Sequence, residues 1–234
     1  MMIYKDIVEG IFIERPNRFI AKVLINGILE TVHVKNTGRC KEILVEGTKI
    51  FLQKSNNPNR KTKYSLISAY KDDMLINIDS QVPNYVVYEA IADNKIREFV
   101  DCDILKREQK YKNSRFDLYY EKNNKKGFIE VKGVTLENDG LAMFPDAPTK
   151  RGTKHLEELI DATCNGYESN LFLLIQIDDI NKFKPNHVTD KLFAKTLLKA
   201  KDAGVRILCY NSLVTKDEII IGSKAKICLE TEFN

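Results

Sequence analysis

The stretch RFDLYYEKNNKKGFIEVKG, residues 115–133, carries the clearest structural signal in this chain. Two runs rich in apolar residues, 115–121 and 127–134, flank the polar segment KNNKK, and this arrangement predicts a β-hairpin. Because successive side chains of a strand point to opposite faces, Glu130 and Lys132 project from the same face of the second strand. If Asp117 lies opposite them on the first strand, two carboxylates and one ammonium group converge at a single point.

The segments on either side of this hairpin show helical and strand patterns. Asn84 is a suitable N-cap for a helix that runs through Phe99, and a strand over 102–111 leads into the hairpin. Downstream, the patterns predict a helix over 155–165 that ends at Gly166, a buried strand over 171–177, a helix over 189–203 with Thr189 as its N-cap, and a strand over 205–210. A helix, three strands and then alternating helices and strands predict a mixed α/β layer architecture for residues 81–234.

The first 80 residues follow a different pattern, with short strands and no convincing helix. The predicted strands cover 10–15, 19–25, 28–34, 48–53 and 64–70, and Asn26-Gly27 between the second and the third is a strong hairpin signal. Several short strands without a helix suggest a small β-barrel. Proline and polar residues accumulate over 79–83, which is the predicted boundary. The chain is therefore expected to be α+β overall, with a barrel over 1–80 and the α/β unit over 81–234.

The predicted cluster of Asp117, Glu130 and Lys132 is suited to metal-assisted hydrolysis of a phosphodiester. Carboxylate oxygens bind Mg²⁺ or Mn²⁺, the metal lowers the pKa of a bound water, and the lysine orients that water or stabilises the phosphate. Glu108 on the preceding strand and Glu89 on the first helix are additional candidate metal ligands. The alternative for the cluster is an exposed hairpin with an ordinary cross-strand ion pair, and for Glu89 a solvent-facing charge.

A second cluster follows in residues 144–156, FPDAPTKRGTKHL. Its prolines and glycine predict a constrained loop that leads into a helix and presents basic residues near the helix start: Lys150, Arg151, Lys154 and His155. Cations at a helix N-terminus oppose the helix dipole, which favours anions, so their presence indicates that a phosphate docks there. The alternative is a basic loop that is merely solvated. The position of the loop directly after the acidic hairpin favours phosphate binding.

The overall composition is that of an ordinary globular protein and excludes several classes. The 234 residues are 43% hydrophobic and 30% charged, and no run approaches the roughly 20 apolar residues of a membrane helix. The first ten residues carry acids and no uninterrupted apolar core, so we expect no secretory signal. Five cysteines without a C-x-x-C spacing argue against a disulfide framework or a cysteine zinc site, and favour a reduced, cytoplasmic compartment.

The net charge of +4 is concentrated in the first 80 residues, which carry 13 Lys and Arg against 9 Asp and Glu, while the remainder carries 24 of each. A local excess of this kind suggests a polyanionic partner, although charge alone favours a solvated lysine-rich loop. Together with Phe19, Phe51 and Tyr64, the basic residues are suited to a nucleic-acid-binding face of the OB-fold type. These basic residues are Arg15, Arg18, Lys54, Arg60, Lys61 and Lys63, and Arg39 is a further candidate nucleic-acid contact.

Four motifs in the chain resemble the sugar fermentation stimulation protein A (SfsA) family. They are NTGRC at 36–40, SRFD at 114–117, FIEVKGVTL at 128–136 and FPDAPTKRGTKHLEEL at 144–159. The resemblance implies an N-terminal OB-fold barrel and a C-terminal domain of the PD-(D/E)XK nuclease-like type, with Asp117, Glu130 and Lys132 as the nuclease-like triad. It also implies DNA binding without strong sequence preference and a role in regulating sugar utilisation.

Three functions are compatible with these observations. The first is a Mg²⁺- or Mn²⁺-dependent nuclease that grips DNA with the barrel and cuts it at the triad. The second is a non-catalytic, DNA-binding regulator of sugar-utilisation genes that keeps the nuclease fold as a scaffold. A small-molecule-binding α/β protein is a distant third. DNA is the expected partner, RNA is not excluded, no membrane is expected, and a homodimer would allow both strands of a duplex to be reached.

Overall fold

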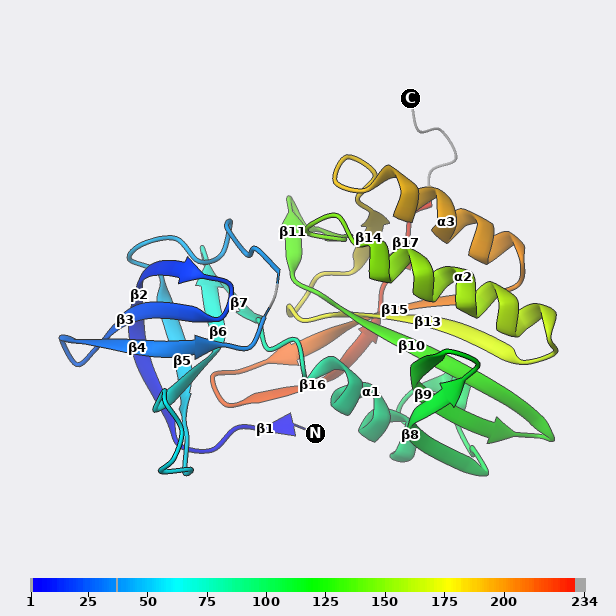
Figure 1. Ribbon diagram of the computed structural model, residues 1–234, viewed down its shortest axis with the longest axis horizontal. Coiled ribbons are helices and arrows are strands. Elements are labelled where there is room, and N and C mark those ends of the chain that lie inside the picture. Colours follow the sequence, from blue (N-terminus) through cyan, green and yellow to red (C-terminus); the bar gives the residue numbers. More distant parts are fainter. Residues whose placement is uncertain (1, 37, 230–234) are drawn as a thin grey trace.

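The strands between residues 7 and 71 close into a five-stranded β-barrel, seen on the left of Figure 1. The computed structural model describes residues 2–36 and 38–229. The barrel strands are β2 Ile7–Asn17, β3 Ile20–Ile25, β4 Ile28–Val34, β5 Lys49–Lys54 and β6 Tyr64–Lys71. Antiparallel pairing follows the order β4-β3-β2-β5-β6, and a parallel pairing of His33 with Ser65 joins β4 to β6. The OB-like barrel predicted from the sequence is therefore confirmed.

Strand alternation explains why this part of the chain closes around a core. On β3 the side chains of Ala21, Val23 and Ile25 are buried, while the residues between them are partly exposed. The predicted turn, Asn26-Gly27, joins β3 to β4 with φ values of 50° and 79°, as a two-residue hairpin of type I′ requires. A short strand, β7 Met74–Asn77, then extends the sheet beyond β6.

The second unit is built on a seven-stranded sheet in the order β1-β16-β15-β13-β10-β9-β8. Its strands are β1 Met2–Ile3, β8 Ile104–Tyr111, β9 Ser114–Lys122, β10 Lys125–Val134, β13 Glu168–Ile175, β15 Arg206–Val214 and β16 Glu218–Lys224. The central strands β10, β13 and β15 are parallel, and the others are antiparallel. Helix α1 covers one face, and α2 and α3 cover the other (Figure 1). The mixed α/β unit is therefore confirmed.

Several strands were not predicted from the sequence. A small sheet beside the barrel contains β11 Leu136–Asn138, β12 Leu141–Phe144, β14 Lys182–Pro185 and β17 Lys226–Ile227. Strands of two to four residues are too short to show a period of two, so the pattern could not reveal them. In addition, β1 pairs with β16, so the chain begins in the large sheet before it enters the barrel.

The prediction of a helix over 84–99 is wrong at both ends. Helix α1 covers Pro83–Ala92, because proline suits the first helical position, where its missing N–H is not needed. Asn84 therefore lies inside the first turn and is not the N-cap, which is Val82. The helix ends where Asn94 adopts a left-handed φ of 57° and the Lys95 N–H bonds to the Ala90 carbonyl. A separate 3₁₀ turn, Arg97–Phe99, follows.

Helix α2 covers Lys150–Cys164 and so begins before the predicted start at His155. Its N-cap is Thr149, whose hydroxyl accepts a hydrogen bond from the Gly152 N–H at 3.0 Å. A Cβ at Gly152 would lie 2.8 Å from the Thr149 side chain, so this glycine permits a close approach and does not break the helix. Helix α3 covers Lys191–Asp202, and its N-cap is Asp190, not Thr189. Within the described ranges, no helix has the length and apolar character needed to cross a bilayer.

Buried hydrogen bonds fix the barrel to the large sheet. Gln176, at the end of β13, donates from Nε2 to Asn77 Oδ1 at 2.9 Å and to the Asp79 carbonyl at 3.2 Å. Asn77 in turn donates from Nδ2 to the Tyr4 hydroxyl at 3.0 Å. An ion pair of 2.6 Å between Lys71 and Glu137 adds a further link. Because hydrophobic core residues of both units also form one cluster, the junction between them is a packed interface.

Candidate active site

Asp117, Glu130 and Lys132 come together where β9 and β10 separate. The ladder between these strands ends with the pair Leu118–Ile129, so Asp117 and Glu130 are the next residues on each strand. Beyond the ladder, Asp117 Oδ2 accepts a hydrogen bond of 2.8 Å from the Val131 N–H, in place of a backbone carbonyl. The Lys132 ammonium contacts Glu130 Oε1. Two carboxylates and one ammonium group therefore form a single cluster at this point of the sheet.

Residues from the helices on both faces complete the cluster. From α1, Asn84 donates from Nδ2 to Asp117 Oδ1 at 2.6 Å. From α2, the His155 Nδ1 contacts Glu130 Oε1, and Arg151 Nε lies 3.4 Å from His155 Nε2. These partners assign the histidine proton to Nδ1, since a carboxylate only accepts. The sequence named His155 as a phosphate contact but did not reveal its bond to Glu130. Pro83 was the signal that would have placed Asn84 inside the helix.

The pKa values of the two carboxylates in the cluster are shifted in opposite directions. Burial, reinforced by the negative charge of Glu130, raises the pKa of Asp117 to about 6. Burial also acts to raise the pKa of Glu130, but the hydrogen bond from His155 and the charge of Lys132 outweigh it and hold that pKa below its ordinary value. Neighbouring groups whose pKa values are driven apart are common at sites of acid–base chemistry or ligand binding.

The donor set of the cluster fits a hard divalent cation. Glu130 is buried, and its Oε2 has no hydrogen-bond partner within the described part of the chain. A buried carboxylate oxygen without a donor is costly unless a cation or water satisfies it. Within residues 2–36 and 38–229, however, no group of three His, Cys, Asp or Glu side chains is arranged around one metal position. Asp117 and Glu130 would therefore hold such an ion together with water or substrate oxygens, as Mg²⁺ sites commonly do.

The two additional candidate ligands have other partners in this structure. Glu108, on β8, is exposed and forms an ion pair of 3.0 Å with Arg115. Glu89 lies on α1, where its side chain is hydrogen-bonded to Tyr85. Asn84 is the residue of α1 whose side chain is hydrogen-bonded to Asp117.

The basic residues fall into separate groups. Lys150, Arg151 and Lys154 are exposed on the first turns of α2, next to the carboxylate cluster, and Lys154 lies 3.5 Å from Glu158. Arg18 and Arg39 line a groove of about 500 Å³ on the barrel, together with Lys41, which was not predicted. Gly38 and Arg39 of the NTGRC motif are part of the lining of this groove. Thr37 of that motif lies outside the described residues.

Arg15 has a structural role that the sequence did not reveal. Its guanidinium donates to the carbonyls of Arg18, Asn36, Gly38 and Arg39 at 2.5–2.8 Å. These bonds fix the 36–39 loop to the barrel and use the N–H groups of both terminal nitrogens of Arg15.

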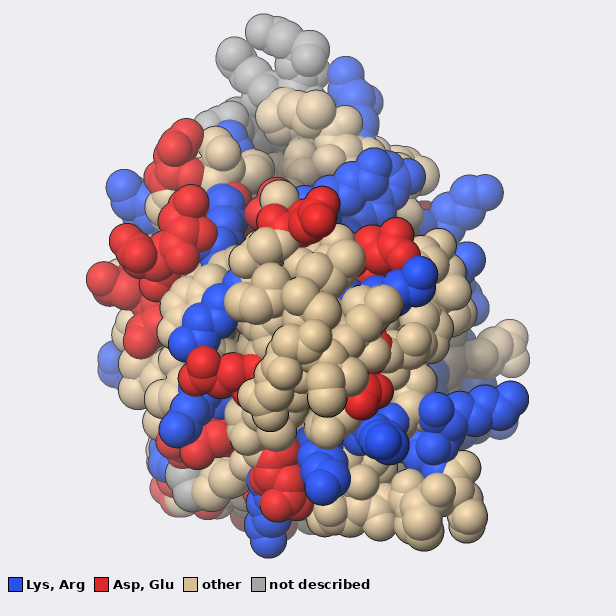
Figure 2. Space-filling model, turned by 90° about the vertical axis from the view of Figure 1, so that its left-hand side faces the viewer, with Lys and Arg blue, Asp and Glu red and all other residues tan. Residues whose placement is uncertain are grey.

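The remaining barrel cations lie in the 55–63 loop, away from the junction. Lys61 and Lys63 are exposed, and Arg60 donates to the Ser65 hydroxyl at 2.8 Å. In Figure 1 this loop is at the bottom of the barrel, between β5 and β6, whereas α2 starts at the junction. The barrel face in Figure 2 is mostly uncharged at its centre, with Lys, Arg, Asp and Glu mixed around it. This face therefore presents no continuous basic surface.

Comparisons with known proteins cover nearly the whole chain. The model of the SfsA N-terminal OB domain matches residues 13–78, and that of the sugar fermentation stimulation protein RE domain matches residues 81–218. A sugar fermentation stimulation protein homolog of Alkaliphilus oremlandii (strain OhILAs) is 54% identical over 231 residues, which cover 97% of this chain and 98% of that protein. One of Clostridium botulinum (strain Langeland) is 53% identical over 228 residues, covering 97% and 99%.

A solved structure extends the similarity to the three-dimensional fold. SfsA of Pyrococcus furiosus in complex with Ca²⁺ superposes with a TM-score of 0.89 at 28% sequence identity, over 97% of each chain. The family models divide the chain into the two units seen here, and the curated relatives share more than half of its residues. The resemblance predicted from the four motifs is thus confirmed, and the chain belongs to the sugar fermentation stimulation protein family.

Proposed function

We propose that this protein binds nucleic acid and hydrolyses its phosphodiester bonds at the Asp117–Glu130–Lys132 cluster with the help of Mg²⁺ or Mn²⁺. One observation carries the proposal: two carboxylates with oppositely shifted pKa values meet one ammonium group directly beside the basic start of α2. The structure of the Pyrococcus furiosus relative was obtained with Ca²⁺, a cation that prefers oxygen ligands. This supports a divalent-cation site in the present chain.

Each residue of the cluster has a distinct part in this proposal. Asp117 and Glu130 would hold the ion, which when bound lowers the pKa of a water and neutralises charge on the phosphate. Lys132, which the fold places against Glu130, donates to a non-bridging phosphate oxygen as negative charge builds up there. Asn84 and the Val131 N–H orient Asp117, and His155 orients Glu130. Lys150 and Arg151 bind the flanking phosphates of the strand.

The test is metal-dependent cleavage of labelled DNA and RNA by the wild-type protein and matched variants. Glu130→Gln and Lys132→Met remove the carboxylate and the ammonium group with little change of shape. Glu9→Gln and Lys126→Met are the controls, because both residues are exposed and lie outside the cluster. The proposal expects cleavage by wild type and both controls, and at least about a hundredfold loss in both cluster variants. Cleavage that survives Glu130→Gln would overturn the assignment.

A second candidate function is nucleic-acid binding without cleavage. It is favoured by the fact that Lys132 and His155 both contact Glu130 Oε1, so that the protein itself satisfies one oxygen of this carboxylate. In that case the fold serves as a scaffold for a DNA-binding regulator. Salt-sensitive binding of DNA without cleavage in the presence of Mg²⁺ or Mn²⁺ would support this function and refute the first.

A further inference from the structure

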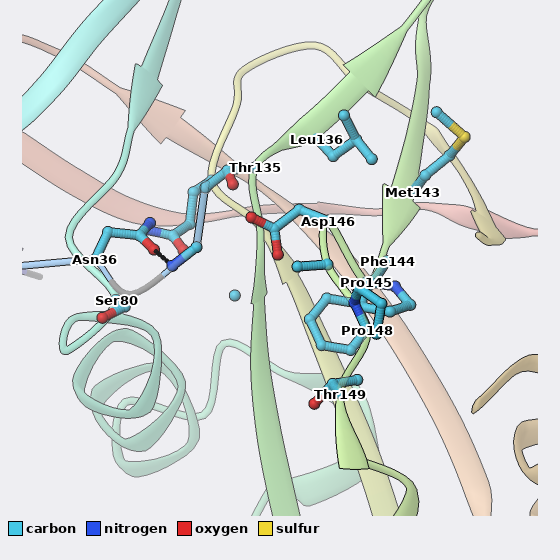
Figure 3. Close-up of a pocket in the computed structure, with 14 residues that line it drawn as sticks. Asn36, Ser80, Thr135, Leu136, Met143, Phe144, Pro145, Asp146, Pro148 and Thr149 are labelled. Atoms are coloured by element: carbon cyan, nitrogen blue, oxygen red, sulfur yellow. Dashed lines mark hydrogen bonds between the residues drawn. The ribbon is translucent and has the colours of Figure 1, made fainter. Parts of the chain in front are cut away.

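A pocket of about 290 Å³ lies at the junction of the two units. Figure 3 shows that its walls come from segments far apart in the chain: Asn36 and Ser80 at the barrel side, Thr135 after β10, and the loop from Phe144 to Thr149 before α2. Such a volume is at the lower limit of small-molecule sites, and gives room for one planar ring system. We call this space the junction pocket.

The junction pocket is built partly on the strand and the helix that also carry the carboxylate cluster. Gly133, which lines the pocket, directly follows Lys132 on β10. Thr149, on the same wall, is the N-cap of α2, the helix that contributes His155 and Arg151 to the cluster. The pocket and the cluster therefore share β10 and α2, although no cluster side chain is among the described residues that line the pocket.

The pocket lining carries one charged side chain, and it is an acid. Asp146 extends into the junction in Figure 3, where its Oδ2 accepts a hydrogen bond of 3.2 Å from the Arg39 N–H. A carboxylate has several lone pairs, so Asp146 can accept a further hydrogen bond. Gly38 allows this approach, since a Cβ there would lie 2.3 Å from Asp146 Oδ2. The remaining lining is polar but uncharged, or apolar, with Phe144, Pro145 and Pro148 offering flat surfaces.

Positive charge lies outside the pocket, in the adjoining barrel groove. The groove lined by Arg18, Arg39 and Lys41 shares Gly38 with the junction pocket and has no acidic residue in its lining. A phosphate is repelled by Asp146 and attracted to this groove and to the start of α2. The separation of charge suits a nucleotide whose base enters the pocket while its phosphates remain outside.

We propose that the junction pocket accepts one unpaired nucleobase, so that the substrate is a single-stranded or locally unpaired nucleic acid. This inference rests on the proposed function of the neighbouring cluster. A base in a continuous duplex is stacked and paired, and can enter a pocket only after it is extruded, at a cost that unpaired strands avoid. Stacking on the aromatic and proline surfaces holds the ring.

Asp146 gives the pocket a preference among bases. Its carboxylate accepts a hydrogen bond from an exocyclic amino group, as acidic side chains do from cytosine N4. Thymine and uracil lack an amino group and present carbonyl oxygens, which face the carboxylate unfavourably. The pocket therefore favours cytosine, adenine or guanine over thymine and uracil.

The experiment compares binding and cleavage of matched labelled oligonucleotides in Mg²⁺: a single strand, its duplex, and the duplex with one bulged nucleotide, which is either C or T. The wild-type protein is expected to bind and cleave the single strand and the duplex with a bulged C roughly tenfold better than the intact duplex. It should also bind and cleave the duplex with a bulged C roughly tenfold better than the duplex with a bulged T. Asp146→Asn, which retains an acceptor for the Arg39 N–H, should abolish the preference for C. Asp139→Asn, on an exposed turn outside the pocket, is its matched control.

A second variant keeps the test decisive. Ala147→Phe fills the pocket from its half-buried lining and should remove the preference for unpaired substrates while duplex binding persists. Equal binding and cleavage of duplex and unpaired substrates by the wild type would overturn the inference and leave the proposed function intact. A C preference that survives Asp146→Asn would also overturn it. Absence of salt-dependent binding to every oligonucleotide would instead refute the proposed function itself.

Discussion

Replacing Asp117 by asparagine should make the metal-free protein more stable at neutral pH. The ionised carboxylate is buried next to Glu130, so the folded state resists its ionisation more than the unfolded chain does. Asparagine removes the charge but keeps an oxygen that can accept from the Val131 N–H, and the Asn84 amide can rotate to face the new NH₂ group. The variant therefore removes the free-energy cost of burying the charge while it leaves the packing of the site nearly unchanged.

The size of this effect follows from the pKa. A rise from 3.8 to about 6 corresponds to about 3 kcal/mol, at about 1.4 kcal/mol for each pH unit. Because the folded pKa is the higher one, this cost is absent below the unfolded pKa, grows as the pH rises from about 4 to about 6, and is complete above that. At pH 4.5 about 1 kcal/mol of it remains. The pKa shift already includes the hydrogen bonds that the carboxylate accepts. What remains is the difference between a carboxylic acid and an amide, which is the same at both pH values.

The decisive quantity is therefore the change in the variant's advantage between pH 7.5 and pH 4.5. Urea denaturation of both proteins in EDTA should show that this advantage falls by about 2 kcal/mol on acidification. Asp103→Asn, an exposed acid at the start of β8, is the control and should show no such dependence. If Asp117→Asn is destabilising at pH 7.5, or its effect is the same at both pH values, the reasoning from burial and charge repulsion is refuted.

Three further predictions follow from the same structure. Arg15→Ala should lower the free energy of unfolding by roughly 2–3 kcal/mol, because it removes hydrogen bonds from a charged group to four carbonyls. Arg18→Ala, the control, should change it by less than about 0.5 kcal/mol. Chemical denaturation of both variants measures the difference. The double variant Arg39→Ala/Lys150→Ala should reduce the slope of log K against log salt by about 2 for a DNA duplex, and an unchanged slope would exclude both side chains from phosphate contact. Mg²⁺ should raise the melting temperature of the wild-type protein but not that of Glu130→Gln, as scanning calorimetry across a metal titration will reveal.

Local patterns in the sequence were sufficient to predict the two units and their order. The barrel follows from short alternating strands and the Asn26-Gly27 turn, because a period of two and a left-handed turn are properties of neighbouring residues. The common face of Glu130 and Lys132 follows from the same alternation. Helix ends were less accurate, since Pro83 and Thr149 set them through the first-turn geometry and not through the apolar period.

The tertiary structure alone decided which residues meet across the molecule. Arg15 reads as a nucleic-acid contact in the sequence, yet it binds carbonyls 21–24 residues away, because the closed barrel brings the 36–39 loop over β2. His155 meets Glu130, and Asn84 meets Asp117, only because α2 and α1 pack on opposite faces of the same strands. The junction pocket depends on a contact between Arg39 and Asp146, separated by 107 residues. The hydrophobic period of a segment indicates which of its faces is buried, but not which distant element covers that face. The contacts that form the site therefore depend on long-range packing.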